Sequence, residues 1–135
     1  MTTKTEVRTT GAPTPMTTFS QGVVKNGYLA ISGQGPQDPA TGDYLYPDDL
    51  AGQTVRTFDN IKAIVEAAGA TFDDLVSIRV FLTKRSDFAA MNVVYEEYMR
   101  ANVPSGVFPV RTTIFVELPN PAMLIEVDAV GIVTA

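Results

Sequence analysis

Two stretches of the chain repeat apolar residues at the three- to four-residue spacing of an amphipathic helix, and they predict helices over about residues 49–68 and 87–101. The apolar face of the first helix consists of Val55, Phe58, Ile61, Val65 and Ala68. The apolar face of the second consists of Phe88, Met91, Val94, Tyr95 and Tyr98. Residues suited to capping a helix N-terminus precede each stretch, Asp48 or Asp49 and then Ser86 or Asp87, and Gly69 suits the end of the first helix.

Runs of β-branched and aromatic residues predict strands around these helices. The expected ranges are 5–9, 21–25, 28–32, 75–82, 108–117 and 123–133. Asn26-Gly27 lies between the second and third runs and predicts a two-residue hairpin, because both residues tolerate positive φ. The order β-β-β-α-β-α-β-β predicts an α+β fold, with two helices packed on one face of a mixed β-sheet. Residues 1–135 are expected to form a single domain.

A sheet covered by helices on one side leaves a second face to be solvated or buried. The last two predicted strands are more apolar than a solvated face requires, and this predicts an oligomer formed through the bare sheet face. The residues concerned are Ile114, Val116, Ile125, Val127, Ala129 and Val133.

The composition excludes several classes of function. The 135 residues are 45% hydrophobic, which is enough for a core, and the net charge of −5 argues against a nucleic-acid-binding protein. The chain has no cysteine and no histidine, which removes disulfides, thiol nucleophiles, Ser-His triads and most transition-metal sites. The N-terminus has no apolar signal core and no run is long enough to span a membrane, so we expect a cytoplasmic protein.

The strongest chemical pair in the sequence is a cation and a carboxylate on the last two strands. Leu118-Pro119-Asn120-Pro121 separates these strands, and if they pair as a hairpin then Arg111 and Glu126 come close together. An ordinary cross-strand ion pair is the structural alternative. Asp128 shares a strand face with Glu126, and the two-residue period of a strand does not distinguish the two carboxylates.

An ordered set of short motifs runs in one register from about residue 18 to the end of the chain. The motifs are Phe19-Ser20-Gln21-Gly22, Ile31-Ser32-Gly33-Gln34, Asp38-Pro39-Ala40-Thr41-Gly42, Gln53 with Asn60-Ile61-Lys62, Glu66-Ala67-Ala68-Gly69-Ala70, Phe88 to Tyr95, Pro109-Val110-Arg111-Thr112-Thr113, Leu118-Pro119 and Ile125 to Val130. With these motifs the chain resembles the RidA/YjgF family of reactive-intermediate deaminases, which older usage calls L-PSP endoribonucleases.

The resemblance implies a chorismate-mutase-like subunit in a homotrimer, with sites in the clefts between subunits. It implies hydrolysis of enamines and imines such as 2-aminoacrylate and 2-iminobutanoate to 2-keto acids and ammonia, a role in metabolite damage control. It also implies that no metal and no organic cofactor is needed, and that the partners are a small carboxylate-bearing substrate and further copies of the chain, with no nucleic acid and no membrane.

Carried over position by position, the resemblance implies that Arg111 binds the substrate carboxylate. It implies that Glu126, rather than Asp128, positions the attacking water. The substrate-binding positions it implies are Phe19, Ser32, Gly33, Asn92 and Thr113. Phe19 departs from the family, because deaminases of this kind commonly have tyrosine there, so the phenyl ring keeps the pocket wall but loses a hydroxyl.

The sequence leaves two other functions open. A trimer that binds a small carboxylate without turning it over is compatible with Phe19. A ribonuclease is compatible with the older family name, although the acidic balance and the missing histidine disfavour it. The natural substrate and its pathway are not fixed by these residues.

Overall fold

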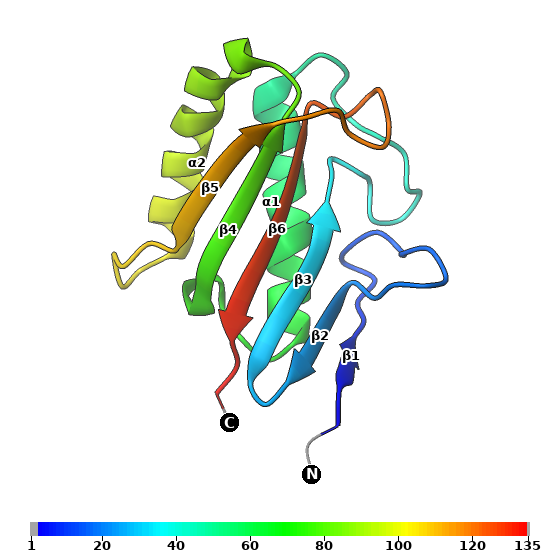
Figure 1. Cartoon of the computed structure of the whole chain (residues 1–135), viewed down its shortest axis with the longest axis vertical. Coiled ribbons are helices and arrows are strands. Elements are labelled where there is room, and N and C mark those ends of the chain that lie inside the picture. The colour runs from blue at the N-terminus through cyan, green and yellow to red at the C-terminus, as the bar shows by residue number, and fades with distance from the viewer. Residues whose placement is uncertain (1–2, 135) are drawn as a thin grey trace.

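The computed structural model describes residues 3–134 and places two helices against one face of a six-stranded mixed sheet (Figure 1). The strands are β1 (Thr5–Val7), β2 (Gly22–Lys25), β3 (Tyr28–Gln34), β4 (Leu75–Leu82), β5 (Val110–Phe115) and β6 (Ile125–Ile132). The helices are α1 (Leu50–Ala67) and α2 (Phe88–Asn102), with short 3-10 turns at Phe72–Asp74 and Arg85–Asp87. The predicted α+β class and the predicted order of elements are confirmed.

The strand order in the sheet is β1-β2-β3-β6-β4-β5, with β5 parallel to β4 and the other pairs antiparallel. The expected hairpin of β5 with β6 is therefore wrong, because β4 lies between them. α2 is the helical crossover that connects β4 to β5, so that β5 can run parallel to β4 at the edge of the sheet. The segment 116–124 then carries the chain past β4, and β6 enters the centre of the sheet next to β3.

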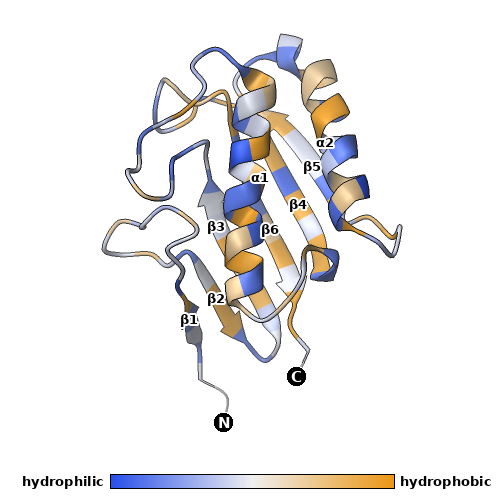
Figure 2. Ribbon diagram, turned by 180° about the vertical axis from the view of Figure 1, so that it is seen from behind, coloured by the Kyte–Doolittle hydropathy of each residue, from blue (hydrophilic) through white to orange (hydrophobic). Residues whose placement is uncertain are grey.

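Both helices lie on the same side of the sheet (Figure 2). Buried apolar side chains of the strands and the helices form one core between them. Ile125, Val127 and Ala129 face this side and are at most 3% exposed, so assigning them to an oligomer face was wrong. A central strand buried against helices reads as apolar at every second position, which explains the error. Val133 also packs against this core.

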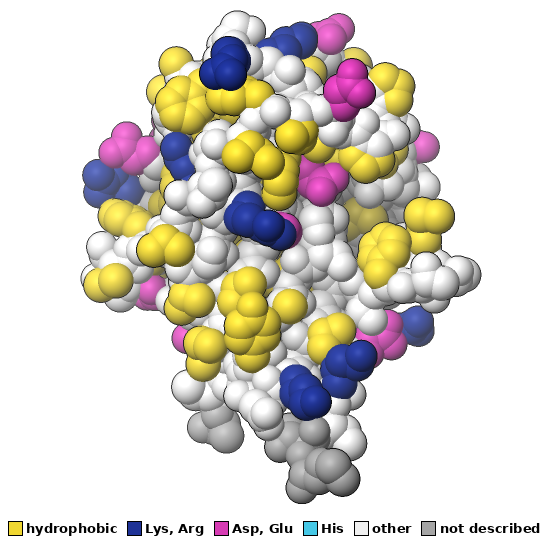
Figure 3. Space-filling view, in the orientation of Figure 1, with side chains coloured by type: hydrophobic (Ala, Val, Ile, Leu, Met, Phe, Trp, Pro, Cys, Tyr) yellow, Lys and Arg dark blue, Asp and Glu magenta, His cyan; other side chains and the backbone are white. Residues whose placement is uncertain are grey.

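The open face of the sheet still carries apolar side chains, interrupted by basic and acidic ones (Figure 3). Val110 is 69% exposed and Ile114 41% exposed on edge strand β5, and Val116, just beyond that strand, is 38% exposed. The two strand residues pair with Ser77 and Phe81 of β4, on the face away from the helices. The prediction of an uncovered apolar sheet surface is thus confirmed for Ile114 and Val116 only.

Local backbone signals behaved as the sequence indicates. Asn26 and Gly27 have φ of 51° and 80°, as the predicted hairpin turn requires. Asp49 caps α1, because its Oδ1 accepts a hydrogen bond from the Gly52 amide at 3.0 Å. Gly69 follows α1 with φ of 82°. Asp87 is the N-cap of α2 but its side chain makes no capping hydrogen bond.

The buried face of α1 is more polar than predicted. Phe58, Ile61 and Val65 are fully buried as expected, but Val55 is 41% exposed. The first turns of the helix instead bury polar side chains, namely Gln53, Thr54, Thr57 and Asn60. The helix therefore contacts loops as well as the sheet.

Gln53 and Asn60 fix two long loops to α1. The Gln53 amide donates to the carbonyl of Ala122 at 2.9 Å, and its Oε1 accepts from the Leu124 amide at 2.8 Å. Asn60 Nδ2 donates to the carbonyls of Gly35 and Gln37 at 3.1 and 3.0 Å. These bonds satisfy the buried amides and hold the segments that enter and leave the central strands.

In α2 the predicted stripe is buried at Met91 and partly buried at Tyr95 and Tyr98. Phe88 is 39% exposed and packs edge-on against Phe115 of β5. Within residues 3–134, no helix combines the length and the apolar character needed to cross a membrane.

Candidate functional site

Arg111 points to the helix side of the sheet. It pairs in register with Ile78, which is fully buried beneath the helices. The guanidinium lies 4.7 Å from the centre of the Tyr95 ring and 5.9 Å from that of Phe88, both on α2. Within residues 3–134, no carboxylate forms an ion pair with it. The cation is thus oriented by aromatic rings while its donors stay available to an anion.

A hollow of about 410 Å³ opens beside this guanidinium, between α2 and β5. It is lined by Asn92, Tyr95, Glu96, Met99, Arg100, Phe108 and Arg111. The lining combines a cationic end with apolar and aromatic walls, which is the usual character of a small-molecule pocket.

Among the polar atoms that are buried without a hydrogen-bond partner in the described chain are Asn92 Oδ1, Tyr95 Oη and Thr113 Oγ1. Thr113 lies two residues beyond Arg111 on the same strand face. Burial raises the pKa of the Tyr95 hydroxyl, and the nearby positive charge of Arg111 opposes that rise. Unsatisfied buried groups in native proteins call for a ligand, water or partner.

Glu126 lies on the opposite, open face. It pairs in register with Phe81 of β4 and is flanked by Gly33 of β3, where an added Cβ would overlap the Glu126 carboxylate. Glycine at this position therefore gives the carboxylate its space. Burial raises the pKa of Glu126 above its ordinary value, and the negative charge of Asp128 adds to that rise.

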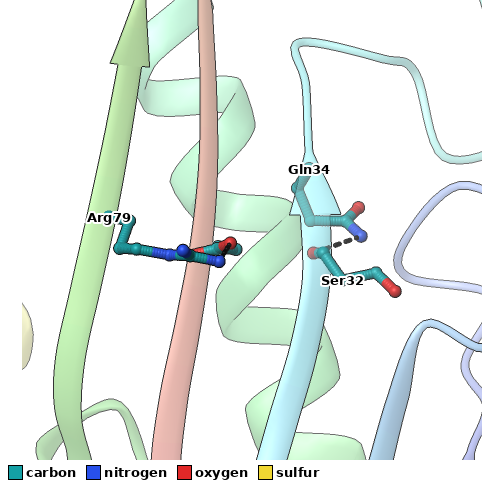
Figure 4. Close-up of polar contacts among 4 residues, drawn as sticks. Ser32, Gln34 and Arg79 are labelled. Atoms are coloured by element: carbon teal, nitrogen blue, oxygen red, sulfur yellow. Dashed lines mark hydrogen bonds and ion pairs between the residues drawn. The ribbon is translucent and has the colours of Figure 1, made fainter. Parts of the chain in front are cut away.

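Asp128 is engaged by another residue. Arg79 of β4 binds it through two contacts, Nε to Oδ1 at 2.9 Å and Nη2 to Oδ2 at 2.6 Å, and its side chain reaches across β6 in Figure 4. In the described part of the chain, Glu126 has no such cationic partner. The structure thus separates two carboxylates that the strand period could not, and leaves Glu126 the freer of the two.

Ser32 connects β3 to the loop before β2. Its hydroxyl donates to the carbonyl of Ser20 at 2.6 Å and its amide donates to that of Gln21 at 2.9 Å. Its own carbonyl accepts from the Gln34 amide side chain at 3.2 Å (Figure 4). The hydroxyl proton of Ser32 is therefore used to hold the loop.

Phe19 belongs to that loop and is 50% exposed. It lines a second, wider hollow of about 940 Å³, formed by residues between Glu6 and Gln21. This hollow does not include Arg111 or Asn92. Phe19 therefore forms a wall that is separate from the guanidinium within one chain.

One chain divides the expected site into two groups. Asn92, Arg111 and Thr113 lie on the helix side near the β5 edge. Gly33 and Glu126 lie on the open face, and Ser32 of β3 is bonded to the loop that carries Phe19.

Sequence reasoning did not identify Tyr95 or Phe88 as neighbours of the cation, because helical spacing marks both as core. It also missed Arg79 as the partner of Asp128, since that pair depends on β4 lying beside β6. Alternation along β4 places Arg79 on the polar side, and this was the available signal.

Comparison with known proteins agrees with this fold. The family model described as endoribonuclease L-PSP matches residues 9–133. A RutC family protein of Pyrococcus horikoshii is 37% identical over 95% of this chain and 97% of its own length. The 2-iminobutanoate/2-iminopropanoate deaminase of Escherichia coli K12 is 35% identical over 93% of this chain and 95% of its own length.

Solved structures show the same architecture. The YjgF gene product of E. coli superposes with a TM-score of 0.86 at 36% identity, over 95% of this chain and 98% of that one. E. coli TdcF with bound serine superposes with a TM-score of 0.87 at 31% identity, over 96% of this chain and 99% of that one. The chain belongs to the endoribonuclease L-PSP family, the RidA/YjgF family.

Proposed function

We propose that the protein is a hydrolytic deaminase that converts small enamines and imines, of the 2-aminoacrylate and 2-iminobutanoate type, to 2-keto acids and ammonia. The observation that carries the proposal is Arg111, a half-buried guanidinium with aromatic support, no acidic partner within residues 3–134, and a hollow in front of it. A guanidinium of this kind grips a carboxylate by two parallel hydrogen bonds. The similarity to named 2-iminobutanoate/2-iminopropanoate deaminases supports the same chemistry.

We further propose that the active site is completed between copies of the chain, in a homotrimer. Arg111 and Glu126 lie on opposite faces of one sheet, so a site that uses both takes one residue from each of two copies. The exposed apolar residues of the β5 edge, Val110 and Ile114, support burial of this region against a neighbour.

In the proposed reaction Arg111 of one copy holds the substrate carboxylate and thereby fixes the imine carbon. An enamine first tautomerises to the imine. Glu126 of the next copy accepts a proton from water as the water oxygen bonds to that carbon. The carboxyl passes that proton to the imine nitrogen, which has received the C=N π pair, and the neutral carbinolamine results. The carboxylate then moves the carbinolamine hydroxyl proton to the same nitrogen as the C=O bond forms, the C–N bond breaks and ammonia leaves. One imine and one water give one 2-keto acid and one ammonia.

A coupled assay tests this function. A threonine or serine dehydratase generates the imine in place, and the protein is expected to speed its hydrolysis, seen as faster release of 2-keto acid and ammonia than the uncatalysed background. A rate equal to the background with both substrates contradicts the proposed activity.

A second function has support from one residue. Phe19 lacks the hydroxyl that deaminases of the resemblance commonly place there, and E. coli TdcF holds serine, which also carries a carboxylate. A trimer that binds a carboxylate without turnover would show calorimetric binding of 2-keto acids and no acceleration in the coupled assay. Ribonuclease activity has less support, since the chain carries a net charge of −5 and no histidine.

A further inference from the structure

Arg111 is a half-buried strand residue whose guanidinium is contacted by aromatic rings and, within residues 3–134, by no carboxylate. The ion pairs of the described chain engage other cations, namely Arg8, Arg79 and Arg100. The carboxylate that shares its hollow, Glu96, binds Arg100 at 3.0 Å and is thereby occupied. The neighbours that do approach the guanidinium are the ring faces of Tyr95 and Phe88.

We propose that Tyr95 and Phe88 are positioning residues that hold the Arg111 guanidinium for a substrate carboxylate by cation–π contact. This inference rests on the proposed function of Arg111. The two rings contact the guanidinium without accepting hydrogen bonds from its N–H donors. These donors therefore stay available to form two hydrogen bonds to a carboxylate.

An aromatic neighbour suits this task better than an acid. An aspartate or glutamate beside Arg111 would satisfy the same N–H groups that a substrate needs, and binding would then have to break an ion pair. A ring quadrupole attracts the cation and restricts its plane while leaving the edge of the guanidinium free. Preorganisation of this kind improves affinity by lowering the ordering that binding requires.

The rings are themselves held by packing. Tyr95 meets Phe58 edge-on at 5.7 Å between ring centres, and Phe88 meets Phe115 at 6.2 Å. Phe58 is fully buried in the core. The position of the guanidinium is therefore fixed by the packing of α1 against α2 as well as by the edge strand that carries Arg111.

The experiment measures binding of an inert carboxylate, 2-oxobutanoate, by calorimetry on the assembled protein, beside the coupled deaminase assay. Tyr95→Phe keeps the ring and is expected to bind within about twofold of the parent. Tyr95→Leu removes the ring and is expected to weaken binding about tenfold, with Phe88→Leu about threefold weaker because its ring is farther away. In the coupled assay these losses are expected in KM more than in kcat.

Phe72→Leu is the matched control. Phe72 packs on Phe58 and Tyr98 in the same aromatic core, but its ring is not one of the two near Arg111. The substitution is therefore expected to lower stability without changing the surroundings of the cation. Parent-like binding in Phe72→Leu together with weak binding in Tyr95→Leu supports the proposal.

Equal binding by the parent and Tyr95→Leu overturns the proposal, and so does an equal loss in Phe72→Leu and Tyr95→Leu, which would show general destabilisation. A parent that binds 2-oxobutanoate but does not hydrolyse imines contradicts the deaminase function, and binding by Tyr95→Leu and Phe72→Leu then decides the role of the two rings. A parent that does not bind the acid overturns the proposed role of the two rings, and the coupled assay then decides the deaminase function separately.

Discussion

Arg111 and Glu126 point to opposite faces of one sheet, with β4 between the strands that carry them. Arg111 pairs with Ile78 on the helix side, and Glu126 pairs with Phe81 on the open side. The hairpin expected from the sequence would have placed them side by side within one chain. In the observed sheet the two side chains of one chain do not share a site, so a reaction that uses both requires Arg111 from one chain and Glu126 from another.

Replacement of Arg111 by alanine is expected to lower kcat/KM of imine hydrolysis by about 100-fold or more, because the substrate loses both its charge partner and its fixed position. Arg111→Lys is expected to recover only part of this, since an ammonium cannot form the planar two-bond grip. The measurement is the coupled dehydratase assay.

Arg85→Ala provides the control for that loss. Arg85 also lies over an aromatic ring, that of Phe115 at 4.9 Å, but it is not among the residues lining the hollow that contains Arg111. Its removal is expected to leave the rate within about twofold of the parent. An Arg111→Ala protein as active as Arg85→Ala removes the guanidinium from the mechanism.

The pH dependence of the rate is expected to report Glu126. Burial and the neighbouring Asp128 raise the pKa of Glu126 above the ordinary value of 4.5, and a base must be ionised to accept a proton. Activity is therefore expected to fall as the pH drops through a midpoint above 4.5. Glu126→Gln is expected to be slow at every pH, without that midpoint.

Arg79 should set the position of the same midpoint, because it neutralises Asp128. Arg79→Met leaves the negative charge of Asp128 uncompensated beside Glu126, and it is expected to raise the midpoint pH below which the rate falls, called here the acid limb. Asp128→Asn removes the negative charge, leaves Arg79 unpaired, and is expected to move the limb downward. A limb with the same midpoint in both variants would show that another group titrates.

Phe19→Tyr tests the one departure from the family pattern. The side chain is 50% exposed, so the change is expected to alter the free energy of unfolding by less than about 0.5 kcal/mol. If the missing hydroxyl limits the reaction, the variant is expected to hydrolyse 2-iminobutanoate several-fold faster in the coupled assay. An unchanged rate means that Phe19 is not limiting for this substrate.

Gln53→Ala is expected to lower the free energy of unfolding by about 2–4 kcal/mol, because it leaves the Ala122 and Leu124 backbone groups without their partner. Val55→Ala, on the exposed side of the same helix, is expected to change it by about 0.5 kcal/mol or less. Chemical denaturation measures both. Equal, small losses would show that the loops hold without this amide.

These residues show what the sequence can and cannot reveal. Helical spacing and the Asn26-Gly27 turn are local signals, so α1, α2 and the β2–β3 hairpin were predictable. Sheet order is not local. In the structure β6 lies beside β4 with Ile125 and Val127 buried, and the registers of β5 and β6 with β4 place Arg111 and Glu126 on their respective faces.

Polar burial was hidden for a similar reason. Gln53 and Asn60 look like surface residues in a helical pattern, and Val55 looks like a core residue. The two amides are buried against loop backbone groups, and the partners Gly35, Gln37, Ala122 and Leu124 lie 23 to 71 residues away in sequence, whereas the Tyr46 carbonyl is seven residues from Gln53. The motif resemblance marked both amides without giving this physical cause.

The central claim is that one copy supplies Arg111 and another supplies Glu126, and mixed oligomers test it most directly. Arg111→Ala and Glu126→Gln proteins are each strongly impaired by this account. When equal amounts are unfolded and refolded together, random assembly gives some interfaces an intact Arg111 facing an intact Glu126.

Statistics of pairing predict recovery of roughly a quarter of the parent activity, because each interface has one chance in four of receiving both native residues. Subunit exchange is confirmed by tagging one variant and recovering the other with it. Mixed oligomers that form but stay as impaired as the two variants alone would contradict the account.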